Sequence, residues 1–410
     1  MRARIGLALA FWIGLAVSAA AIPYIPPPQA IYEAPIDRAL ENVAAMADVP
    51  EAQRESTLAR LNLLAYARDN SNFTYMREND QLAMAGSILC SEVPPTRYGP
   101  PPPDAPTFGP DDRCAAFYFH LGPVTEIFDS NFPASPSAAA LARLEAARTH
   151  YVRALQLEPN NIRARLGYAY VLDRMGRLNQ ARRELRTIIR LGLPRLAGQT
   201  SEWEDHAVLT EAAEHLSHLA KSHGDRARVA QLRARLDASQ PLIYVTPIVV
   251  PLADRPFNRI VDVNSDVAFD FAGTGDTRAQ GWLTEDAAWL VWDPEWRGHV
   301  RSGFDMIGQR TWSVFWSDGF EALRALDDDR DGELTGGELG GLSLWRDSNR
   351  NGVSDPGEVI PANVHGIVAI AVRGAPTRPG LITAPAGVRF DDGRTRPLYD
   401  WTPGLDAPVS

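Results

Sequence analysis

The chain has 410 residues, 45% of them hydrophobic, and a formal net charge of −10 at pH 7. This length allows two or three domains and this hydrophobic content can build real cores, so the composition excludes a disordered protein. Only one lysine accompanies forty arginines, a skew that suggests genome composition, so arginine richness by itself does not indicate a nucleic-acid partner.

Residues 1–21 have the organisation of a secretory signal peptide. A charged start precedes an apolar run from Ile5 to Val17, and the small residues Ala20 and Ala21 offer a cleavage site. The run is too short to span a bilayer comfortably, and no later segment reaches transmembrane length. We therefore expect an exported protein, periplasmic or extracellular, that is not an integral membrane protein after signal cleavage. Export also argues against a nucleic-acid partner.

Residues 22–136 are predicted to be a helical N-terminal region. Helical spacing of apolar residues between Ile36 and Asp69 indicates two packed helices. A proline-rich excursion at 94–110 cannot be helix or central strand. Cys90 and Cys114 flank it, and in an oxidising compartment a disulfide between them is favoured over the alternative of two buried thiols.

Residues 137–238 carry an internal helical repeat. The small and apolar residues recur at a spacing of about 34 residues. They are Ala147, Tyr151, Ala154 and Pro159 in the first unit, Ala169, Gly176, Ala181, Leu185, Ile188 and Pro194 in the second, and Leu216, Ala220, Gly224, Ala230 and Leu236 in a weaker third. This segment resembles a tetratricopeptide-repeat protein, with an unrelated helical hairpin bundle as the alternative. The resemblance implies a surface for a protein partner and does not name the partner.

Residues 239–256 contain prolines and read as an extended linker or edge strand. After this segment the helical spacing of apolar residues gives way to a strand-like pattern. Residues 257–372 contain short apolar strands and seven of the ten tryptophans, so aromatic burial should stabilise a small β-rich module. Residues 373–410 read as a C-terminal β-hairpin tail. The predicted fold class is α+β and multidomain.

Residues 327–338, called loop 1 below, place oxygen-bearing side chains where an EF-hand calcium loop needs them. Such a loop uses positions 1, 3, 5, 7, 9 and 12, with a glycine at position 6 for the turn. In loop 1 these positions hold Asp327, Asp329, Asp331, Glu333, Thr335 and Glu338, with Gly332 at position 6. Position 7 supplies its backbone carbonyl, and the long Glu at position 12 closes the site with both oxygens.

Residues 347–358, called loop 2, repeat the pattern in frame. The ligand positions hold Asp347, Asn349, Asn351, Val353, Asp355 and Glu358, with Gly352 at position 6. Two copies are a far more specific signal than one, and together they predict two bound Ca²⁺ ions. The alternative is a pair of solvated acidic loops that bind nothing.

The two loops depart from a standard EF-hand pair. Only the eight residues Leu339 to Arg346 separate them, too few for an exit helix, a linker and an entry helix. Position 8 of loop 2 is Ser354 rather than an aliphatic residue, which puts the usual strand bridge between paired loops in doubt. We expect compact structural sites rather than a switch that opens a groove.

The order of motifs around these loops resembles that of a calcium-binding module found in many secreted bacterial proteins. The matching stretches are Phe269–Phe271, Gly281–Trp282, a strand ending in Asp293, Asp318–Leu323 before loop 1, Leu344–Asp347 before loop 2, and Gly387–Gly393 with Tyr399–Trp401 at the end. In such modules two further Asp-rich loops often precede the pair. Here the loops at Asp270 and Asp293 lack the ligand set, and Arg297 is interpreted as filling the vacant space with its own charge.

Charge is distributed unevenly between the two halves. Residues 318–358 have a net charge of −7, and residues 141–196 have a net charge of +8. The basic repeat is therefore predicted either to dock on the acidic module or to bind an acidic partner.

No enzyme motif stands out, and no catalytic residue is assigned. HExxH, GxSxG and phosphate-loop sequences are absent from the chain. His215 and His218 have a spacing that could hold zinc, but a polar helix face explains them better because no third ligand is evident.

The sequence thus predicts an exported, calcium-stabilised interaction or scaffold protein that is not an enzyme. One rival is a cell-envelope hydrolase with only structural calcium, whose catalytic residues would be sought around Glu78, Asp80, Asp111, Asp112 and His120. A purely structural envelope protein is the third possibility.

Overall fold

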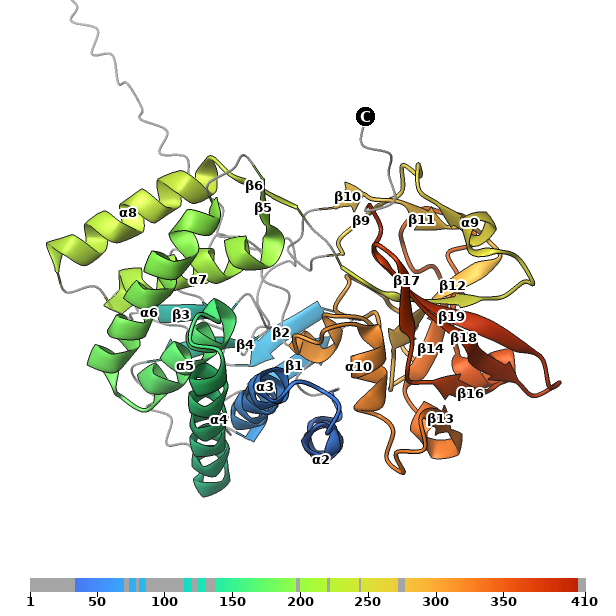
Figure 1. Cartoon of the computed structure of the whole chain (residues 1–410), viewed down its shortest axis with the longest axis horizontal. Helices are drawn as coiled ribbons and strands as arrows, with labels where there is room; N and C mark the ends of the chain where they lie inside the picture. The colour runs from blue at the N-terminus through green and yellow to red at the C-terminus, as the bar shows by residue number, and fades with distance from the viewer. Residues whose placement is uncertain are drawn as a thin grey trace, which may run out of the picture.

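A computed structural model describes residues 34–69, 74–78, 81–85, 114–119, 124–129, 137–196, 200–219, 222–242, 245–271 and 277–404. Within these ranges a helical half is followed by a β-rich half, and the two lie side by side (Figure 1). The signal peptide, the proline-rich excursion and Cys90 fall outside the described residues, so these predictions stay untested.

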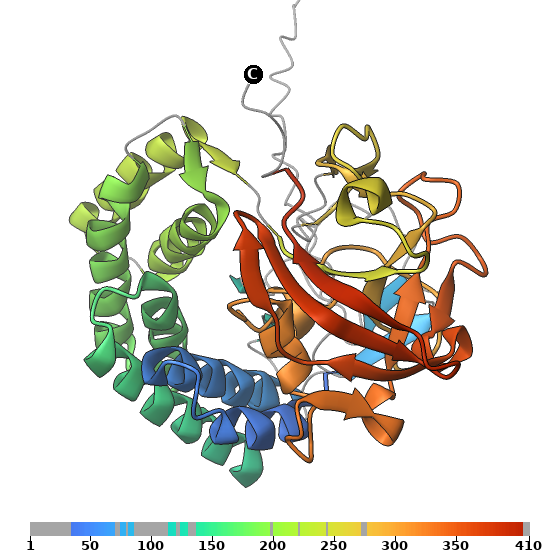
Figure 2. The same cartoon turned by 45° about the vertical axis from the view of Figure 1, so that its right-hand side comes forward.

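The helical half is a succession of antiparallel hairpins. Its helices are α2 (Ile36–Ala45), α3 (Glu51–Asp69), α4 (Ala138–Leu157), α5 (Ile162–Arg174), α6 (Leu178–Gly192), α7 (Trp203–Leu219) and α8 (His223–Asp237). A short 3-10 helix, η1 (Leu193–Leu196), follows α6. Figure 2 shows the helices arranged as an arc whose open side faces the β-rich half. No helix of the described part is long and apolar enough to cross a membrane.

Local sequence signals explain where the repeat helices begin and end. The side chains of Ser137, Asn161 and Ser222 cap α4, α5 and α8 by accepting a backbone N–H three residues on. Gly176, in a left-handed conformation with φ of 70°, follows the last turn of α5. Pro159 and Gly176, two of the recurring residues of the repeat, thus lie between α4 and α5 and between α5 and α6.

Small residues let the repeat helices approach closely, as the spacing predicts. Ala169 and Ala181 are fully buried where α5 meets α6. The ring of Tyr151, on α4, lies where a Cβ of residue 167 would sit, so Gly167 is required for this contact. The all-helical, tetratricopeptide-like architecture of residues 138–237 is thus present.

The region predicted to be helical at 22–136 is helical only in part. The two predicted helices are present as α2 and α3, but strands β1 (Thr74–Glu78), β2 (Gln81–Ala85), β3 (Cys114–Phe119) and β4 (Val124–Asp129) follow. They form two antiparallel hairpins, β1–β2 and β3–β4. The helical prediction does not hold for these segments: residues 114–119, for example, include three aromatic residues, which favour strands.

The β-rich half is built on one antiparallel sheet. Its strand order is β13, β16, β18, β19, β7, β12, β14 and β15, with β17 paired to β18. The strands are β7 (Ile248–Pro251), β12 (Ala287–Trp292), β13 (Glu333–Thr335), β14 (Leu342–Trp345), β15 (Val359–Pro361), β16 (Ile367–Ala371), β17 (Ala375–Arg378), β18 (Leu381–Phe390) and β19 (Thr395–Trp401).

Smaller elements complete both halves. In the helical half, β5 (Thr200–Glu202) pairs with β6 (Gln240–Leu242). In the β-rich half they are α9 (Phe257–Ile260), β8 (Val261–Asp262) paired with β11 (Trp282–Leu283), β9 (Ala268–Phe269) paired with β10 (Arg278–Ala279), η2 (Thr311–Ser313), α10 (Gly319–Arg324), η3 (Gly336–Leu339) and η4 (Ala362–His365).

The sheet reaches beyond the limits that the sequence indicates for the module. Strand β7 lies inside the segment read as a linker or edge strand, yet it is an inner strand, paired with β12 and β19. Strands β18 and β19 form the expected C-terminal hairpin and occupy the middle of the sheet rather than a separate tail. Burial explains this placement, because Ile248, Val249 and Val250 are all fully buried.

Tryptophan rings fill the core of this half, as the composition predicts. Trp282, Trp289, Trp312, Trp345 and Trp401 are among the largest fully buried side chains. Trp282 lies edge-on to Trp289 and to Trp345, with ring centroids 5.5 and 5.4 Å apart.

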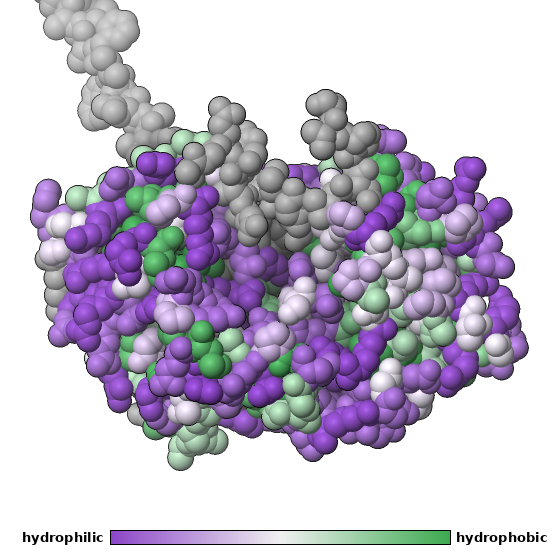
Figure 3. All heavy atoms as spheres, in the orientation of Figure 1, coloured by the Kyte–Doolittle hydropathy of each residue, from purple (hydrophilic) through white to green (hydrophobic). Residues whose placement is uncertain are grey.

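The face of the molecule in Figure 3 is mostly hydrophilic, with small scattered hydrophobic areas.

Replacing Gly387 by Ala should destabilise the sheet. An added Cβ would meet the backbone N of Leu398 at 2.5 Å and the backbone O of Ala384 at 2.9 Å, where β18 and β19 shift register. Overpacking of this kind costs about 1–3 kcal/mol. Urea unfolding should show this loss, whereas Gly224→Ala, in the open first turn of α8, should leave stability unchanged or slightly raised. An equal effect of both changes would contradict the packing described.

Candidate metal sites

Loops 1 and 2 fold their backbones around their own polar side chains in the same way. The side chain at position 1 accepts the N–H of position 6, that at position 3 accepts the N–H of position 5, and that at position 5 accepts the N–H of position 7. In loop 1 the acceptors are Asp327, Asp329 and Asp331, at 3.2, 3.1 and 2.8 Å. In loop 2 they are Asp347, Asn349 and Asn351, at 2.8, 3.1 and 2.7 Å. The in-frame sequence repeat is therefore also a structural repeat.

Position 12 closes each loop through both carboxylate oxygens. One oxygen accepts the N–H of position 2, and the other accepts the N–H of position 9. The distances are 2.7 and 2.9 Å for Glu338 and 2.7 and 3.2 Å for Glu358. Each glutamate thus joins the start of its loop to its end and turns its carboxylate inward.

The backbone conformation repeats as well. Position 4 is left-handed in both loops, at Arg330 with φ of 63° and at Arg350 with φ of 57°. Position 6 is left-handed at Gly332 and Gly352, with φ of 96° and 72°. An arginine rarely adopts this conformation, so the surrounding hydrogen bonds must hold it there.

Loop 1 gathers carboxylates at one point. One oxygen each of Asp327, Asp329 and Glu338 lie within 4.8 Å of one another, a spacing that one metal ion can bridge. The side chain of Glu333, at position 7, instead pairs with Arg389 at 3.0 Å, outside this cluster. This arrangement agrees with a ligand role for the backbone carbonyl of position 7 rather than for its side chain.

Asp327 has a buried oxygen without a hydrogen-bond donor. Its side chain is 6% exposed, and Oδ1 has no partner among the described residues, while Oδ2 is bound by Gly332. Burial, together with the negative charges of Glu338 and Asp331, raises the pKa of Asp327 although backbone hydrogen bonds oppose this effect. An unsatisfied buried carboxylate oxygen is costly, and a cation at the centre of loop 1 would satisfy it.

Loop 2 carries less charge and is tied to the aromatic core. Asn349 Nδ2 and Asn351 Nδ2 both donate to Asp355 Oδ2, at 2.7 and 2.9 Å. Asp347, 7% exposed, accepts the indole N–H of Trp282 at 2.8 Å. The polar groups of loop 2 therefore satisfy one another more completely than those of loop 1.

A third loop, residues 293–304, has the same turn without the ligands. Asp293 accepts the N–H groups of Arg297 and Gly298 at 2.8 and 2.9 Å, as position 1 of loop 2 does for positions 5 and 6. Positions 4 and 6, Trp296 and Gly298, are again left-handed, with φ of 52° and 73°. The loop backbone has thus been retained although the sequence has changed.

An arginine takes part in the third loop where a metal ligand would be needed. Arg297, at position 5, lies with its Nε 3.5 Å from Glu295 Oε2, at position 3, and its side chain is mostly buried. Phe304 occupies position 12 and offers no oxygen. The guanidinium group thus supplies positive charge beside the acid at position 3, in agreement with the interpretation of Arg297 as the replacement for an ion.

The loops are not paired with each other as in an EF-hand lobe. Loop 1 lies at the β13 edge of the sheet and loop 2 joins β14 to β15 at the opposite edge. Position 8 of loop 1, Leu334, pairs with Ile370 of β16. Position 8 of loop 2, Ser354, binds position 8 of the third loop, accepting the Val300 N–H at 2.8 Å. Strand β14 fills the short segment between loops 1 and 2, so the predicted absence of a four-helix lobe is confirmed.

Several other residues singled out in the sequence are placed elsewhere or lie outside the described part. The His215 ring lies 3.3 Å from Asp173 Oδ2, and the side chain of His218 is not described. The side chains that the hydrolase alternative would need, and the partner of Cys114, also lie outside the described residues. Neither the hydrolase alternative nor the disulfide is tested.

Two contacts of the loops were missed from the sequence. The hydrogen bond from Trp282 to Asp347 joins residues 65 positions apart. Asp328, at position 2 and not a ligand position, binds Arg38 at 2.6 Å across 290 positions. The loop pattern predicts the ligands but contains no signal for such distant partners.

The fold and the loops together define an α+β protein with a helical repeat and a β-rich module. Comparison with known families gives two matches: residues 248–401 match the SPM domain, and residues 138–192 match a tetratricopeptide repeat. The C-terminal module, with both loops and the whole large sheet, is therefore an SPM domain. No match was found among curated proteins.

Replacing Asp327 by Asn should stabilise the metal-free protein. The amide can still accept the Gly332 N–H, and it removes a buried charge whose pKa is raised, so a gain of about 1 kcal/mol is expected at pH 7. The raised pKa means that ionisation weakens the folded state as pH rises from the ordinary aspartate value to the folded value. The difference between variant and parent should therefore be absent at low pH and grow through that window. Chemical unfolding in chelator across this pH range measures it, and a less stable variant at pH 7 would contradict the account.

Proposed function

We propose that this protein binds two Ca²⁺ ions, one in each of loops 1 and 2, and that the ions stabilise the SPM domain. One observation carries the proposal. The two loops repeat the same side-chain-to-backbone hydrogen bonds position by position, and in loop 1 these bonds leave a buried oxygen of Asp327 directed at no donor. Such a loop lowers its free energy by enclosing a cation.

The donor set favours calcium over other metals. All side-chain donors at the ligand positions are oxygens, and no His or Cys is among them, which disfavours zinc and other softer metals. The twelve-residue loops offer carboxylates, a backbone carbonyl and a two-oxygen Glu, a flexible set that suits Ca²⁺ better than the octahedral Mg²⁺.

The two sites should differ in affinity. Loop 1 offers four carboxylates at positions 1, 3, 5 and 12, whereas loop 2 offers Asp347, Asp355 and Glu358 with two amides. The amides of loop 2 already donate to Asp355 and must reorient to present oxygen to an ion. Loop 1 is therefore the tighter site. Extracellular modules bind Ca²⁺ with dissociation constants of order 10⁻⁴–10⁻³ M, which suits the proposed export to a calcium-rich compartment.

The helical half supplies the interaction function in this proposal. The tetratricopeptide-like repeat is a surface of packed hairpins that suggests protein binding, and residues 141–196 within it have a net charge of +8. The protein would then be a calcium-stabilised scaffold rather than an enzyme.

Calcium should raise the thermal stability of the protein through two separable sites. At a free concentration one hundred times the dissociation constant, each site adds about 2.7 kcal/mol. Calorimetric titration of chelator-treated protein should give two binding events. Glu338→Gln and Glu358→Gln should each abolish one, because each removes a carboxylate that closes a loop. Absence of binding heat together with an unchanged melting temperature would contradict the proposal.

Tryptophan emission should separate the two sites. Asp347 binds the Trp282 indole, so an ion in loop 2 changes the surroundings of that ring directly, whereas loop 1 has no described hydrogen bond to a tryptophan. The calcium-dependent emission change should therefore persist in Glu338→Gln and disappear in Glu358→Gln. Trp282→Phe is the matched control. It should lose the calcium-dependent emission change while still binding calcium. An emission change that disappears in Glu338→Gln and persists in Glu358→Gln would contradict this assignment.

A further inference from the structure

The helical half touches the module at the start of loop 1. Arg38, on α2, donates to Asp328 Oδ1 at 2.6 Å and also to the carbonyl of Leu326. Asn42, one turn further on, donates to Asp328 Oδ1 at 2.9 Å and to the Ala325 carbonyl at 3.1 Å. Three acceptors within residues 325–328 thus receive two side chains of α2, and in Figure 1 α2 lies close to α10 and β13.

Charge strengthens this contact. Burial acts to raise the pKa of Asp328, but the hydrogen bonds from Arg38 and Asn42 and the charge of Arg38 outweigh it and hold the pKa below its ordinary value. Asp48, just after α2, pairs with Arg324 at 2.8 Å and with Arg373. The helical half is therefore bound to Arg324, directly before residues 325–328, and to Arg373 as well as to the segment itself.

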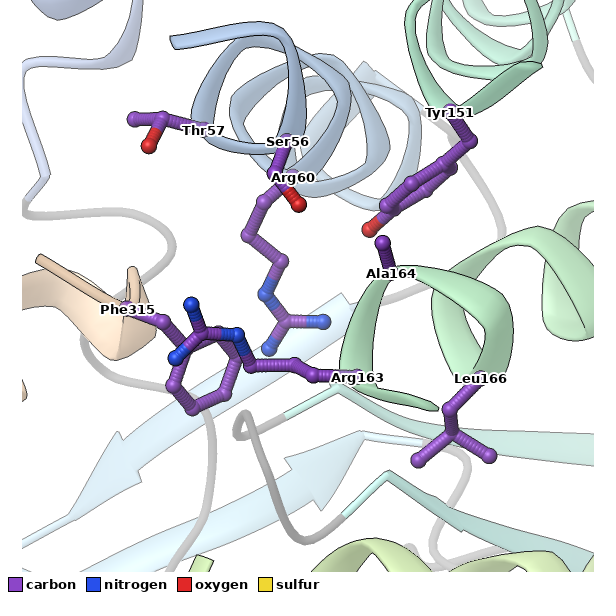
Figure 4. A pocket seen from close by; sticks show the side chains of 8 residues that line it. All are labelled: Ser56, Thr57, Arg60, Tyr151, Arg163, Ala164, Leu166 and Phe315. Carbon is purple, nitrogen blue, oxygen red and sulfur yellow. The ribbon is translucent and has the colours of Figure 1, made fainter. Parts of the chain in front are cut away.

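A second contact lies further along the same boundary. Arg60 of α3 and Arg163 of α5 place their guanidinium carbons 5.3 and 5.1 Å from the centre of the Phe315 ring (Figure 4). The guanidinium carbon of Arg310, in the module, lies 5.3 Å from the same ring centre. Gln53 also donates to the Phe315 carbonyl at 3.0 Å. Burial lowers the pKa of Arg310 to about 10, although the charge of Glu204 opposes this effect. The module residue Phe315 is thus enclosed by cations from both halves.

We propose that an ion in loop 1 strengthens the docking of the helical half onto the module, which rests on the proposed calcium function. The coupling passes through Asp328. Its side chain accepts from Arg38 and Asn42, and its backbone N–H donates to Glu338 Oε1, the residue that would close the site around the ion. The same residue therefore belongs both to the loop and to the contact between the halves.

The physical cause is repulsion in the empty loop. Without a cation, four carboxylates of loop 1 repel one another, and the buried Asp327 makes this repulsion costly. Asp327 and Asp328 begin loop 1, and the other acceptors for α2, the carbonyls of Ala325 and Leu326, directly precede it, so a displacement of the start of the loop also displaces these acceptors. An ion removes the repulsion, fixes these acceptors and favours the docked arrangement.

Loop 2 provides an internal comparison. Its contacts are within the module: Arg350 pairs with Asp262 at 2.5 Å, Asp347 binds Trp282, and Ser354 binds Val300. The contacts described for loop 2 include none to the helical half. The two sites thus have different roles, loop 2 holding the aromatic core and loop 1 regulating the boundary. Calcium withdrawal would loosen the boundary and expose the guanidinium groups of Arg60 and Arg163.

Coupling of this kind is reciprocal, which makes it measurable as an affinity. If an ion favours docking, then weakening the docking must weaken ion binding by the same factor, typically 5-fold to 150-fold. Removing the two α2 side chains should therefore lower the calcium affinity of loop 1, although neither side chain is a ligand.

The experiment uses the full chain with Glu358→Gln, so that loop 1 alone binds. Calorimetric titration compares this parent with the same chain carrying Arg38→Ala and Asn42→Ala. The double change should weaken calcium binding about 5-fold or more. Arg143→Ala is the matched control, because it removes an ion pair to Asp37 of α2 at 2.6 Å that does not involve loop 1, and it should leave the affinity unchanged. With Glu358 restored, an intact Trp282 emission response in the double variant shows that its module has folded.

Hydrogen exchange gives a second readout. Calcium should slow amide exchange in α2 in the parent but not in Glu338→Gln. If the parent binds calcium but the double variant binds it with the same affinity, the coupling is overturned and the calcium function stands. The same holds if the parent binds calcium but amide exchange in α2 does not depend on calcium. No calcium uptake by the parent overturns both.

Discussion

The repulsion among the carboxylates of loop 1 is the constraint on which this account depends. A backbone that turns Asp327, Asp329 and Glu338 to within 4.8 Å of one another concentrates negative charge, and the burial of Asp327 removes the water that would screen it. The fold does not relieve this cost by itself. The described hydrogen bonds to Asp327, Asp329 and Glu338 all come from the backbone of the loop. The outer carboxylates Asp328 and Glu333 instead bind Arg38 and Arg389.

The rest of the module is arranged around such loops in a consistent way. The sheet carries loop 1 at one edge and loop 2 at the other, so each site fixes a different boundary of the aromatic core. The third loop is informative because it shows the same turn with Arg297 beside Glu295. A loop that has lost its position-12 glutamate thus keeps its shape with an internal cation, whereas loops 1 and 2 contain no such residue at a ligand position.

The sequence predicts this molecule best where one short motif determines the local structure. The twelve-residue loop pattern predicts the turns and the inward carboxylates, and the eight residues between the loops predict the absence of a four-helix lobe. The repeat spacing predicts the hairpins from Ala147 to Leu236. Prediction from the sequence fails where pairing is long-range. The segment that holds β7 reads as an extended linker or edge strand, yet β7 is an inner strand because it pairs with β12 on one side and with β19, from the far end of the chain, on the other. The contacts of Asp328 with α2 and of Phe315 with α3 and α5 have no local signature either, since each depends on how two separately patterned halves meet.

The most direct test of the central claim is a crystal structure of the protein grown with terbium, whose anomalous scattering locates bound ions that replace calcium. The account predicts two anomalous peaks, one enclosed by Asp327, Asp329 and Glu338 and one enclosed by Asp347, Asp355 and Glu358. It predicts none in the third loop beside Arg297. Empty loops 1 and 2 in such a crystal, with the fold otherwise intact, would contradict it.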